Sequence, residues 1–434
     1  MATYYVSLSG NDSNPGTIGS PFLTFTKARS VIVAGDTVFV RAGTYSERIV
    51  LNNAPNPSGT SWSSPITYSA YNSEVVTIRN IGLSTTTGVN RYMIFKDFII
   101  DGQYSEVETV YMSSGTSHIR VQNCEVKRAT WQGFLMHKNS GGNCEILDCN
   151  IHLNGTPEIT SGGHNGSHRH GIYCQSSNNL FDGNEFYNNT GFGITIFASG
   201  TTPSTGGPSN NIIRNNLIHH NHWWNGAVSP ETFGSSGIGM DCGSNNRCYN
   251  NVIYSDFSGI AVKWGSPIDN KIYNNTIFNM TTDDAIDIGA GASRTVVKNN
   301  IVYGTHATIQ NDNSSTVSSN NLVGVNPQFV NSGAANFRLQ SSSPAINNGV
   351  VLSETSPDYD GVTRPQGTAY DMGAFEFVGG VAPDTTPPTG SVTFPPSSST
   401  VSGTINITCL ATDNIGIANV QFYLDGSPLG GPVT

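Results

Sequence analysis

The most restrictive feature of this 434-residue chain is a repeat in its middle, with a period of about 22 residues. Each copy begins with a Gly, continues with a short alternating apolar segment, and passes a polar bend before an apolar–Asn–Asn segment. Copies start at Gly171, Gly237 and Gly259, and the steps from Gly171 to Gly193 and from Gly237 to Gly259 are both 22 residues. Such a period indicates a solenoid, because one unit cannot bury its apolar face without neighbours.

The apolar segments of the repeat predict strands and not helices. They are short, alternate with period two, and are bounded by Asn, Gly and Ser. Three short strands per turn, with turns stacked on one another, make a parallel β-helix. The chain has 48 Gly residues, and the bends of a β-helix favour Gly and Asn because both tolerate positive φ.

At this point the chain resembles the right-handed parallel β-helix proteins of the pectin-lyase-like group, of the polysaccharide lyase type. Residues 4–12 and 34–45 are similar to the usual start of these solenoids, and residues 326–345 and 371–376 are similar to their frequent end. The resemblance covers about residues 3–377 and implies an all-β, right-handed fold with caps at both ends. It does not fix the activity, since lyases, hydrolases, epimerases and non-enzymes share this fold.

The sequence divides into five predicted parts. They are an N-terminal cap (1–63) with a helical stretch from Phe25 to Ile32, the β-helix (64–325), a C-terminal cap (326–377), a Gly/Pro/Thr-rich linker (378–388) and a partial immunoglobulin-like module (389–434). The last part resembles the β-sandwich repeats appended to bacterial secreted enzymes. We therefore expect a secreted or cell-surface protein. No leader peptide is visible, and Met1-Ala2 reads as a start added to a mature sequence.

Charge and cysteine content narrow the partners and the chemistry. A net charge of −10 argues against nucleic acid as a partner, and the absence of an 18-residue apolar run argues against a membrane span. An anionic polysaccharide stays open as a partner, because calcium or a local basic patch can bridge two acidic molecules. We expect a monomer. The seven cysteines are expected to be small buried residues of the solenoid, with a Cys242–Cys248 disulfide as the alternative.

Aligned Gly-led strands predict a cluster of charged residues on one outer face. Side chains alternate in and out along a strand, and successive coils stack about 4.8 Å apart. Asp241, Lys263 and Asp287 are then neighbours, with Asp283 and Asp284 in the bend before Asp287. One exposed Lys is thus expected among four carboxylates. The cluster is either a functional site or a solvated ladder of salt bridges that contributes little to stability.

The charged cluster has the residue types needed for β-elimination of a uronate. That reaction needs a base at C5 and positive charge beside the C6 carboxylate. Lys263 is the candidate base, and calcium held by Asp283, Asp284, Asp287 and Asp241 would supply the charge. Asp241 is also a candidate catalytic residue.

The segment Asp283-Asp284-Ala285-Ile286-Asp287 is similar to the Asp-Asp-Gly-Ile-Asp motif of the family-nine pectate lyases, which implies calcium binding by its aspartates. The chain departs from that family in having Ala285 for Gly and no Lys-bearing Gly-led strand after Asp287. Lys263 is therefore a candidate from its position alone, with Arg294 and Lys298 as substitutes.

Three insertions interrupt the repeat at 155–170, 198–208 and 222–235, and loops on a rigid scaffold usually carry function. We expect them to form a groove on the Gly-led face. His168 and His170 are candidate acids or bases. Candidate substrate-binding residues are Arg169, His137, Tyr173, Phe197, Trp223 and Trp224, since aromatic rings stack on sugars.

Two other functions fit the same residues. Paired carboxylates, such as Asp241 with Asp283, Asp284 or Asp287, would also suit a glycoside hydrolase. The immunoglobulin-like tail would suit a non-catalytic glycan-binding or adhesion protein.

Overall fold

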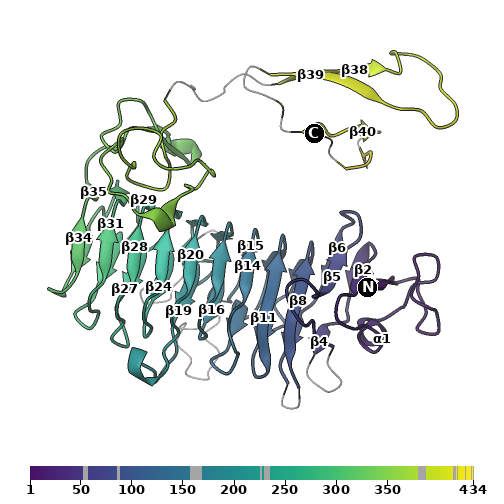
Figure 1. Ribbon diagram of the computed structural model, residues 1–434, viewed down its shortest axis with the longest axis horizontal. Coiled ribbons are helices and arrows are strands. Elements are labelled where there is room, and N and C mark those ends of the chain that lie inside the picture. The colour runs from purple at the N-terminus through teal and green to yellow at the C-terminus, as the bar shows by residue number, and fades with distance from the viewer. Residues whose placement is uncertain are drawn as a thin grey trace. The chain divides into compact units, whose positions relative to one another are not determined.

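The chain folds into a parallel β-helix followed by a separate small β unit, and the two compact units are Met1–Phe377 and Val378–Thr434. The computed structural model describes residues 1–51, 57–85, 88–156, 169–224, 227–228, 235–379 and 388–413, together with 417, 419–425, 427–431 and 433. In Figure 1 the strands of the first unit run side by side along its length, from the purple N-terminal end to the green end. The expected solenoid of stacked parallel strands is confirmed.

Three long sheets form the faces of the solenoid, and every neighbouring pair of strands within them is parallel. The 12-stranded sheet contains β1 (Thr3–Val6), β2 (Thr37–Val40), β5 (Ile66–Ala70), β8 (Asn90–Lys96), β11 (Thr116–Gln122), β14 (Glu145–Leu147), β17 (Leu180–Asp182), β20 (Ile212–Arg214), β25 (Arg247–Tyr249), β28 (Lys271–Tyr273), β31 (Val296–Lys298) and β34 (Val317–Ser319).

The 10-stranded sheet is built from the Gly-led strands and their equivalents. It contains β4 (Ile49–Leu51), β7 (Ile81–Leu83), β10 (Glu108–Met112), β13 (Gln132–Met136), β16 (Ile172–Cys174), β19 (Ile194–Ile196), β24 (Ile238–Met240), β27 (Ile260–Val262), β30 (Ile286–Ile288) and β33 (Ile309–Asn311).

The 11-stranded sheet completes each coil. It contains β3 (Gly43–Tyr45), β6 (Val76–Ile78), β9 (Ile99–Asp101), β12 (Glu125–Lys127), β15 (Asn150–His152), β18 (Glu185–Tyr187), β21 (Leu217–His219), β26 (Val252–Tyr254), β29 (Thr276–Phe278), β32 (Ile301–Tyr303) and β35 (Leu322–Val323).

The interior of the solenoid consists of stacked apolar side chains. On the 12-stranded sheet, Ile213, Cys248, Ile272 and Val297 face each other in register on consecutive coils, and all four are fully buried. Because the strands are only two to seven residues long, none contributes more than a few inward residues. The buried area therefore comes from repetition along the axis and not from any single coil.

The Asn–Asn pairs of the repeat explain how the chain turns each corner between the 12- and 11-stranded sheets. The first Asn of a pair takes a left-handed conformation, as at Asn250 (φ 54°) and Asn274 (φ 48°), which Asn tolerates better than most residues. The second Asn points inward, and the Asn251 side-chain amide donates to the Asn275 side-chain oxygen at 2.9 Å.

Similar amide ladders occur at all three corners of the coil. They are the 12/11 corner ladder (Asn184, Asn216, Asn251, Asn275, Asn300, Asn321), the 10/12 corner ladder (Asn179, Asn211, Asn246, Asn270) and the 11/10 corner ladder (Asn154, Asn189, Asn221, Asp256). The buried side-chain amides of each ladder are hydrogen-bonded to one another. The corners therefore bury few unpaired polar groups.

The two ends of the solenoid differ. At the N-terminal end lies α1 (Phe25–Arg29), whose Phe25 and Ala28 are buried. The helix is shorter than the predicted stretch to Ile32, because the Ser30 hydroxyl donates to the Lys27 carbonyl at 2.7 Å and a β-branched run follows. The predicted cap 1–63 also supplies β1 to β4, the first strands of the three sheets.

The remaining short elements lie in loops and in the C-terminal part of the first unit. They are the hairpin β22 (Trp223–Trp224) and β23 (Ala227–Val228), the pair β36 (Phe329–Asn331) and β37 (Asn336–Leu339), and the 3-10 turns η1 (Pro203–Thr205), η2 (Ser332–Ala334) and η3 (Ser353–Thr355). Phe329, Phe337 and Leu339 form a second apolar core with the 11-stranded sheet side chain Ile301.

The second unit contains β38 (Thr389–Phe394), β39 (Thr408–Thr412), β40 (Tyr423–Leu424) and β41 (Ser427–Pro428), in two antiparallel pairs. None of its described residues is buried. Within the described part of the chain, no helix has the length and apolar character of a membrane span.

The cysteines behave as packing residues. All seven are free thiols, and all except Cys409 are buried. The alternative of a Cys242–Cys248 disulfide is wrong for this structure, because Cys248 points into the coil from β25 whereas Cys242 lies in a turn with positive φ.

Candidate functional site

The charged cluster lies at the ends of three neighbouring strands of the 10-stranded sheet. Gly239 of β24 pairs with Ala261 of β27, which in turn pairs with Asp287 of β30. Asp241 and Lys263 follow directly after β24 and β27. The register expected from the Gly-led strands is therefore the one observed, and it brings these side chains together from three successive coils.

The Asp241 carboxylate is buried, whereas we expected it to point outward and be exposed. Its side chain is buried, with 2% of the residue exposed, and one oxygen accepts the backbone N–H groups of Lys263 (2.7 Å) and Trp264 (3.0 Å). The strand pattern stops after β24, so the chain bends inward and the carboxylate satisfies amides of the next coil. Burial raises the pKa of Asp241 to about 6, although the two amides oppose the shift.

Lys263 lies among the other carboxylates. Its ammonium forms an ion pair with Asp287 and lies 3.6 Å from an oxygen of Asp283, and 29% of its side chain is exposed. Burial lowers the pKa of Lys263, but hydrogen bonds and charges from Asp287 and Asp283 outweigh burial, so the pKa lies above its usual value. In this arrangement the amine is protonated at neutral pH.

Asp283, Asp284 and Asp287 offer one oxygen each within 4.8 Å of one another. The Thr308 hydroxyl donates to Asp284, and burial raises the pKa of Asp287 against the opposing charge of Lys263. Three carboxylate oxygens in this space are the donor set that hard divalent cations such as Ca²⁺ prefer. The residues therefore fit the calcium site that the sequence predicts. Asp241 does not belong to this group of three, because its described contacts are backbone amides.

A cavity of about 230 Å³ opens beside this cluster. Asp241, Lys263 and Asp283 line it together with Trp264, of which 52% is exposed. Phe192, Ser236, Ser258 and Ala261 complete its wall. The sequence reasoning missed Trp264, although its place directly after Lys263 was a signal, because an exposed Trp beside a polar cluster is typical of sugar-binding sites.

Comparison with known proteins identifies the family. Residues 4–254 match the family described as "Pel9A-like, right handed beta helix region". The chain belongs to this family. Residues 388–434 match a bacterial Ig domain. Both the pectin-lyase-like, right-handed β-helix and the immunoglobulin-like module expected from the sequence are thus confirmed. The match to the Pel9A-like family includes Asp241 but ends before Lys263 and the three aspartates.

Two solved structures share the fold of this Pel9A-like chain. Pectate lyase Pel9A is 20% identical, with a TM-score of 0.62 over 87% of this chain and 96% of that one. A rhamnogalacturonan lyase is 18% identical, with a TM-score of 0.58 over 84% of this chain and 99% of that one. The uncharacterized protein YwoF of Bacillus subtilis (strain 168) is 29% identical over 136 residues, which span 28% of this chain and 28% of YwoF.

His170 lies next to the cavity wall of this Pel9A-like chain without lining the cavity. It is buried, its Nδ1 accepts the backbone N–H of Phe192 at 3.1 Å, and its ring packs edge-on against Phe192 and Tyr173. In its neutral form the ring therefore carries its proton on Nε2. Arg169 is also buried. His168 lies outside the described residues.

The predicted groove falls in part on residues that are not described, namely 157–168, 225–226 and 229–234. The groove therefore stays a prediction. Sugar contact by Trp223 and Trp224 also stays a prediction, because only the backbone of their strand β22 is described. Tyr173 is 4% exposed and burial raises its pKa, whereas Phe197 and His137 are half-buried. Tyr173 is thus mainly a packing residue as the structure shows it.

Arg294 is not brought to the cluster. It precedes β31 on the 12-stranded sheet and forms a two-pronged ion pair with Asp269, at 2.7 and 2.6 Å. Lys298 lies on β31 itself. Among the expected basic residues, the structure therefore joins Lys263 to the aspartates and leaves Arg294 and Lys298 on another face.

Proposed function

We propose that the protein is an extracellular polysaccharide lyase that cleaves a uronate-containing glycan by calcium-assisted β-elimination at the Lys263 site. The observation that carries the proposal is that the Lys263 amine is paired with Asp283 and Asp287 of the carboxylate cluster, while Lys263 and Asp283 line one cavity with the exposed Trp264. The names of the similar structures, a pectate lyase and a rhamnogalacturonan lyase, support an acidic polysaccharide as substrate. The bacterial Ig domain match supports an extracellular location.

The aspartates and Lys263 have to separate for this chemistry to occur. Asp283, Asp284 and Asp287 would hold the calcium ion, which supplies positive charge for the uronate carboxylate. Once these carboxylates no longer hold the ammonium, burial becomes the main influence on Lys263 and lowers its pKa toward the range of a general base.

The Lys263 amine takes the proton from C5, and the electrons of that C–H bond form the C4=C5 double bond. The bond between C4 and the glycosidic oxygen breaks, and the leaving oxygen takes a proton from water or from a protonated group in the cavity. Asp241 acts as a positioning residue in this proposal, because it holds the backbone at Lys263 and Trp264.

A glycoside hydrolase is the second candidate, and one observation favours it. The pKa of about 6 at Asp241 would keep part of this carboxyl protonated near neutral pH, as a general acid requires. Asp283, whose carboxylate lines the same cavity, would then be the partner.

The deciding experiment is a panel of acidic and neutral polysaccharides, assayed with calcium and with chelator. A lyase releases unsaturated products that absorb in the ultraviolet, and its activity should disappear with chelator and return with calcium. New reducing ends without this absorbance would contradict the lyase and favour the hydrolase. Binding without any cleavage across the panel would contradict both and favour a glycan-binding protein.

A further inference from the structure

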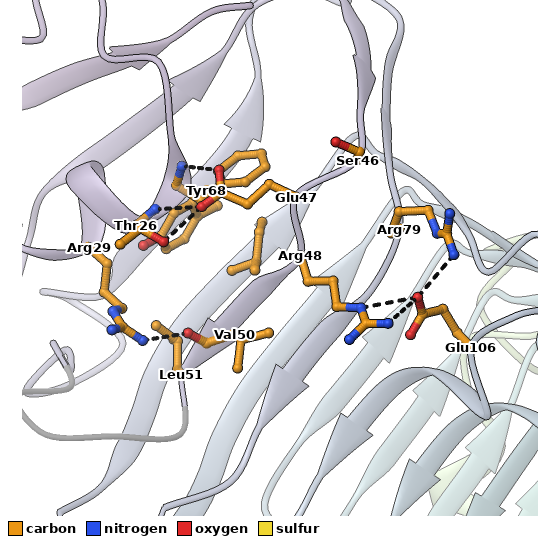
Figure 2. Close-up of a pocket in the computed structure, with 12 residues that line it drawn as sticks. Thr26, Arg29, Ser46, Glu47, Arg48, Val50, Leu51, Tyr68, Arg79 and Glu106 are labelled. Atoms are coloured by element: carbon orange, nitrogen blue, oxygen red, sulfur yellow. Dashed lines mark hydrogen bonds and ion pairs between the residues drawn. The ribbon is translucent and has the colours of Figure 1, made fainter. Parts of the chain in front are cut away.

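A second cavity, of about 490 Å³, lies at the other end of the same sheet. It is bounded by α1 and by β4, which is the terminal strand of the 10-stranded sheet. Figure 2 shows Arg29 reaching the Val50 carbonyl on one side of the cavity, while Arg48 and Arg79 converge on Glu106 on the other. From the chemistry of this cavity we infer a second binding site, for the carboxylate of an acidic sugar.

The first support is a buried hydroxyl without a partner. Tyr68 is 0% exposed and lines the cavity, yet its Oη has no hydrogen-bond partner among the described residues. Burial raises the pKa of this phenol, so it stays protonated and has a hydrogen to donate. Because native proteins rarely leave such groups unsatisfied, the cavity is suited to a ligand that brings an acceptor oxygen.

The second support is the balance of charge. Both carboxylates of the cavity are already used: Glu47 accepts the backbone N–H groups of Phe25 and Thr26, at 2.7 and 3.0 Å, and Glu106 accepts Arg48 and Arg79. Arg29 donates to the Val50 carbonyl at 2.7 Å, and no described carboxylate forms an ion pair with it. One guanidinium charge is therefore left for an anion, and guanidinium groups match carboxylates in geometry.

The walls of the cavity point to a sugar and not to a bare anion. Ile49, Leu51 and Phe25 provide apolar surface, and the Ser46 and Thr26 side chains are polar. A pyranose ring has an apolar face and a rim of hydroxyls, so it suits such a mixed wall, and the volume lies within the usual range for small-molecule sites. A uronate combines this ring with the carboxylate that Arg29 and Tyr68 would bind.

The test uses the full chain and a ligand that cannot be cleaved. Binding of D-galacturonate is measured by calorimetry, beside galactose, which has no carboxylate, and acetate, which has no ring. We expect galacturonate to bind more tightly than either. Tyr68→Phe and Arg29→Gln should each weaken it by roughly 10- to 100-fold, while the control Arg338→Gln, in the C-terminal part of the unit, should leave it unchanged.

Two further measurements keep the inference falsifiable. Without ligand, Tyr68→Phe should unfold at the same temperature as the native protein or a higher one, because it removes an unsatisfied hydroxyl. Binding should persist in Lys263→Ala, which separates this site from the lyase proposal. Equal binding of acetate and galacturonate, no effect of the two variants, or a lower unfolding temperature for Tyr68→Phe would each overturn the inference. So would the absence of galacturonate binding, which would leave the cavity to water.

Discussion

At the scale of single residues, Lys263 is the side chain on which the proposed chemistry depends. Lys263→Ala should reduce turnover by about 10²- to 10⁴-fold, the usual contribution of a general base, with little change in substrate affinity. Steady-state rates on the active polysaccharide check this. The matched control is Lys298→Ala on β31, which should behave as the native enzyme. A Lys263→Ala variant with full activity would remove this amine from the mechanism.

Trp264 should act on binding and not on the chemical step. Trp264 is 52% exposed and lines the cavity, so removing its side chain should cost the fold little. Trp264→Ala should weaken substrate binding by roughly 1–2 kcal/mol through the loss of an aromatic contact surface, and Trp264→Phe should lose less. Affinity for oligosaccharides, measured in the Lys263→Ala background, separates the two effects. Equal affinity in all three proteins would argue against sugar stacking at this position.

Asp256 should make stability depend on pH. It ends the 11/10 corner ladder, fully buried, and burial raises its pKa to about 6 from 3.8. The folded state therefore holds the proton more tightly than the unfolded state, so the contribution of Asp256 is fully present below about pH 4 and is lost as the pH rises through about 6.

The substitution Asp256→Asn removes this titration and keeps an acceptor for the Asn221 amide, which donates to Asp256 at 3.0 Å. The free energy of unfolding should rise by roughly 1–2 kcal/mol at pH 8 and show no gain near pH 4. This gain is smaller than the free energy that corresponds to the raised pKa of Asp256. The reason is that the new amide no longer accepts the Phe257 N–H. Denaturant unfolding at the two pH values checks it, and a gain that is equal at both would contradict the assignment.

At the scale of elements, the amide ladders should be the most sensitive part of the coils. Asn216 donates to the Phe181 carbonyl and to Asn251, and its oxygen accepts two N–H groups of Asn184. Asn216→Ala leaves several of these groups buried and unpaired, so we expect a loss of about 3–5 kcal/mol. Thermal and denaturant unfolding measure it. The exposed Asn139→Ala is the control, and a similar small loss in both would show that the ladder contributes little.

The sequence predicts the coils better than it predicts the site. The Gly-led strands gave the register of Gly239, Ala261 and Asp287 correctly, because period-two alternation fixes which side chains share a face. Asp241 was misplaced because it follows the strand, where alternation no longer applies. The second cavity was missed because Arg29, Arg48 and Tyr68 come from α1, a loop and β5, and no local pattern links them.

At the scale of the whole molecule, the two compact units should be separable. The β-helix has its own core within Met1–Phe377, and the described residues from 388 onward are not buried. Residues 1–377 alone should therefore keep the unfolding temperature and the polysaccharide activity of the full chain. Calorimetry and the product assay on both proteins check this. A loss of several degrees or of activity in the shorter protein would show that the C-terminal unit supports the β-helix.

Because of the three corner ladders, the solenoid can become longer or shorter by one whole coil at a time during evolution. Asn184 and Asn216 are 32 residues apart, and the coil between them carries one Asn at every corner. Excision of residues 185–216 would bring new partners into the same relation at each corner, namely Asn184 with Asn251, Asn179 with Asn246 and Asn154 with Asn221. A duplicated coil would fit by the same rule. Growth and shrinkage by one coil thus need no new hydrogen-bonding solution at the corners. The distance between the two ends of such a scaffold can therefore change by whole coils, although this excision would also remove Phe192 from the wall of the cavity beside Lys263.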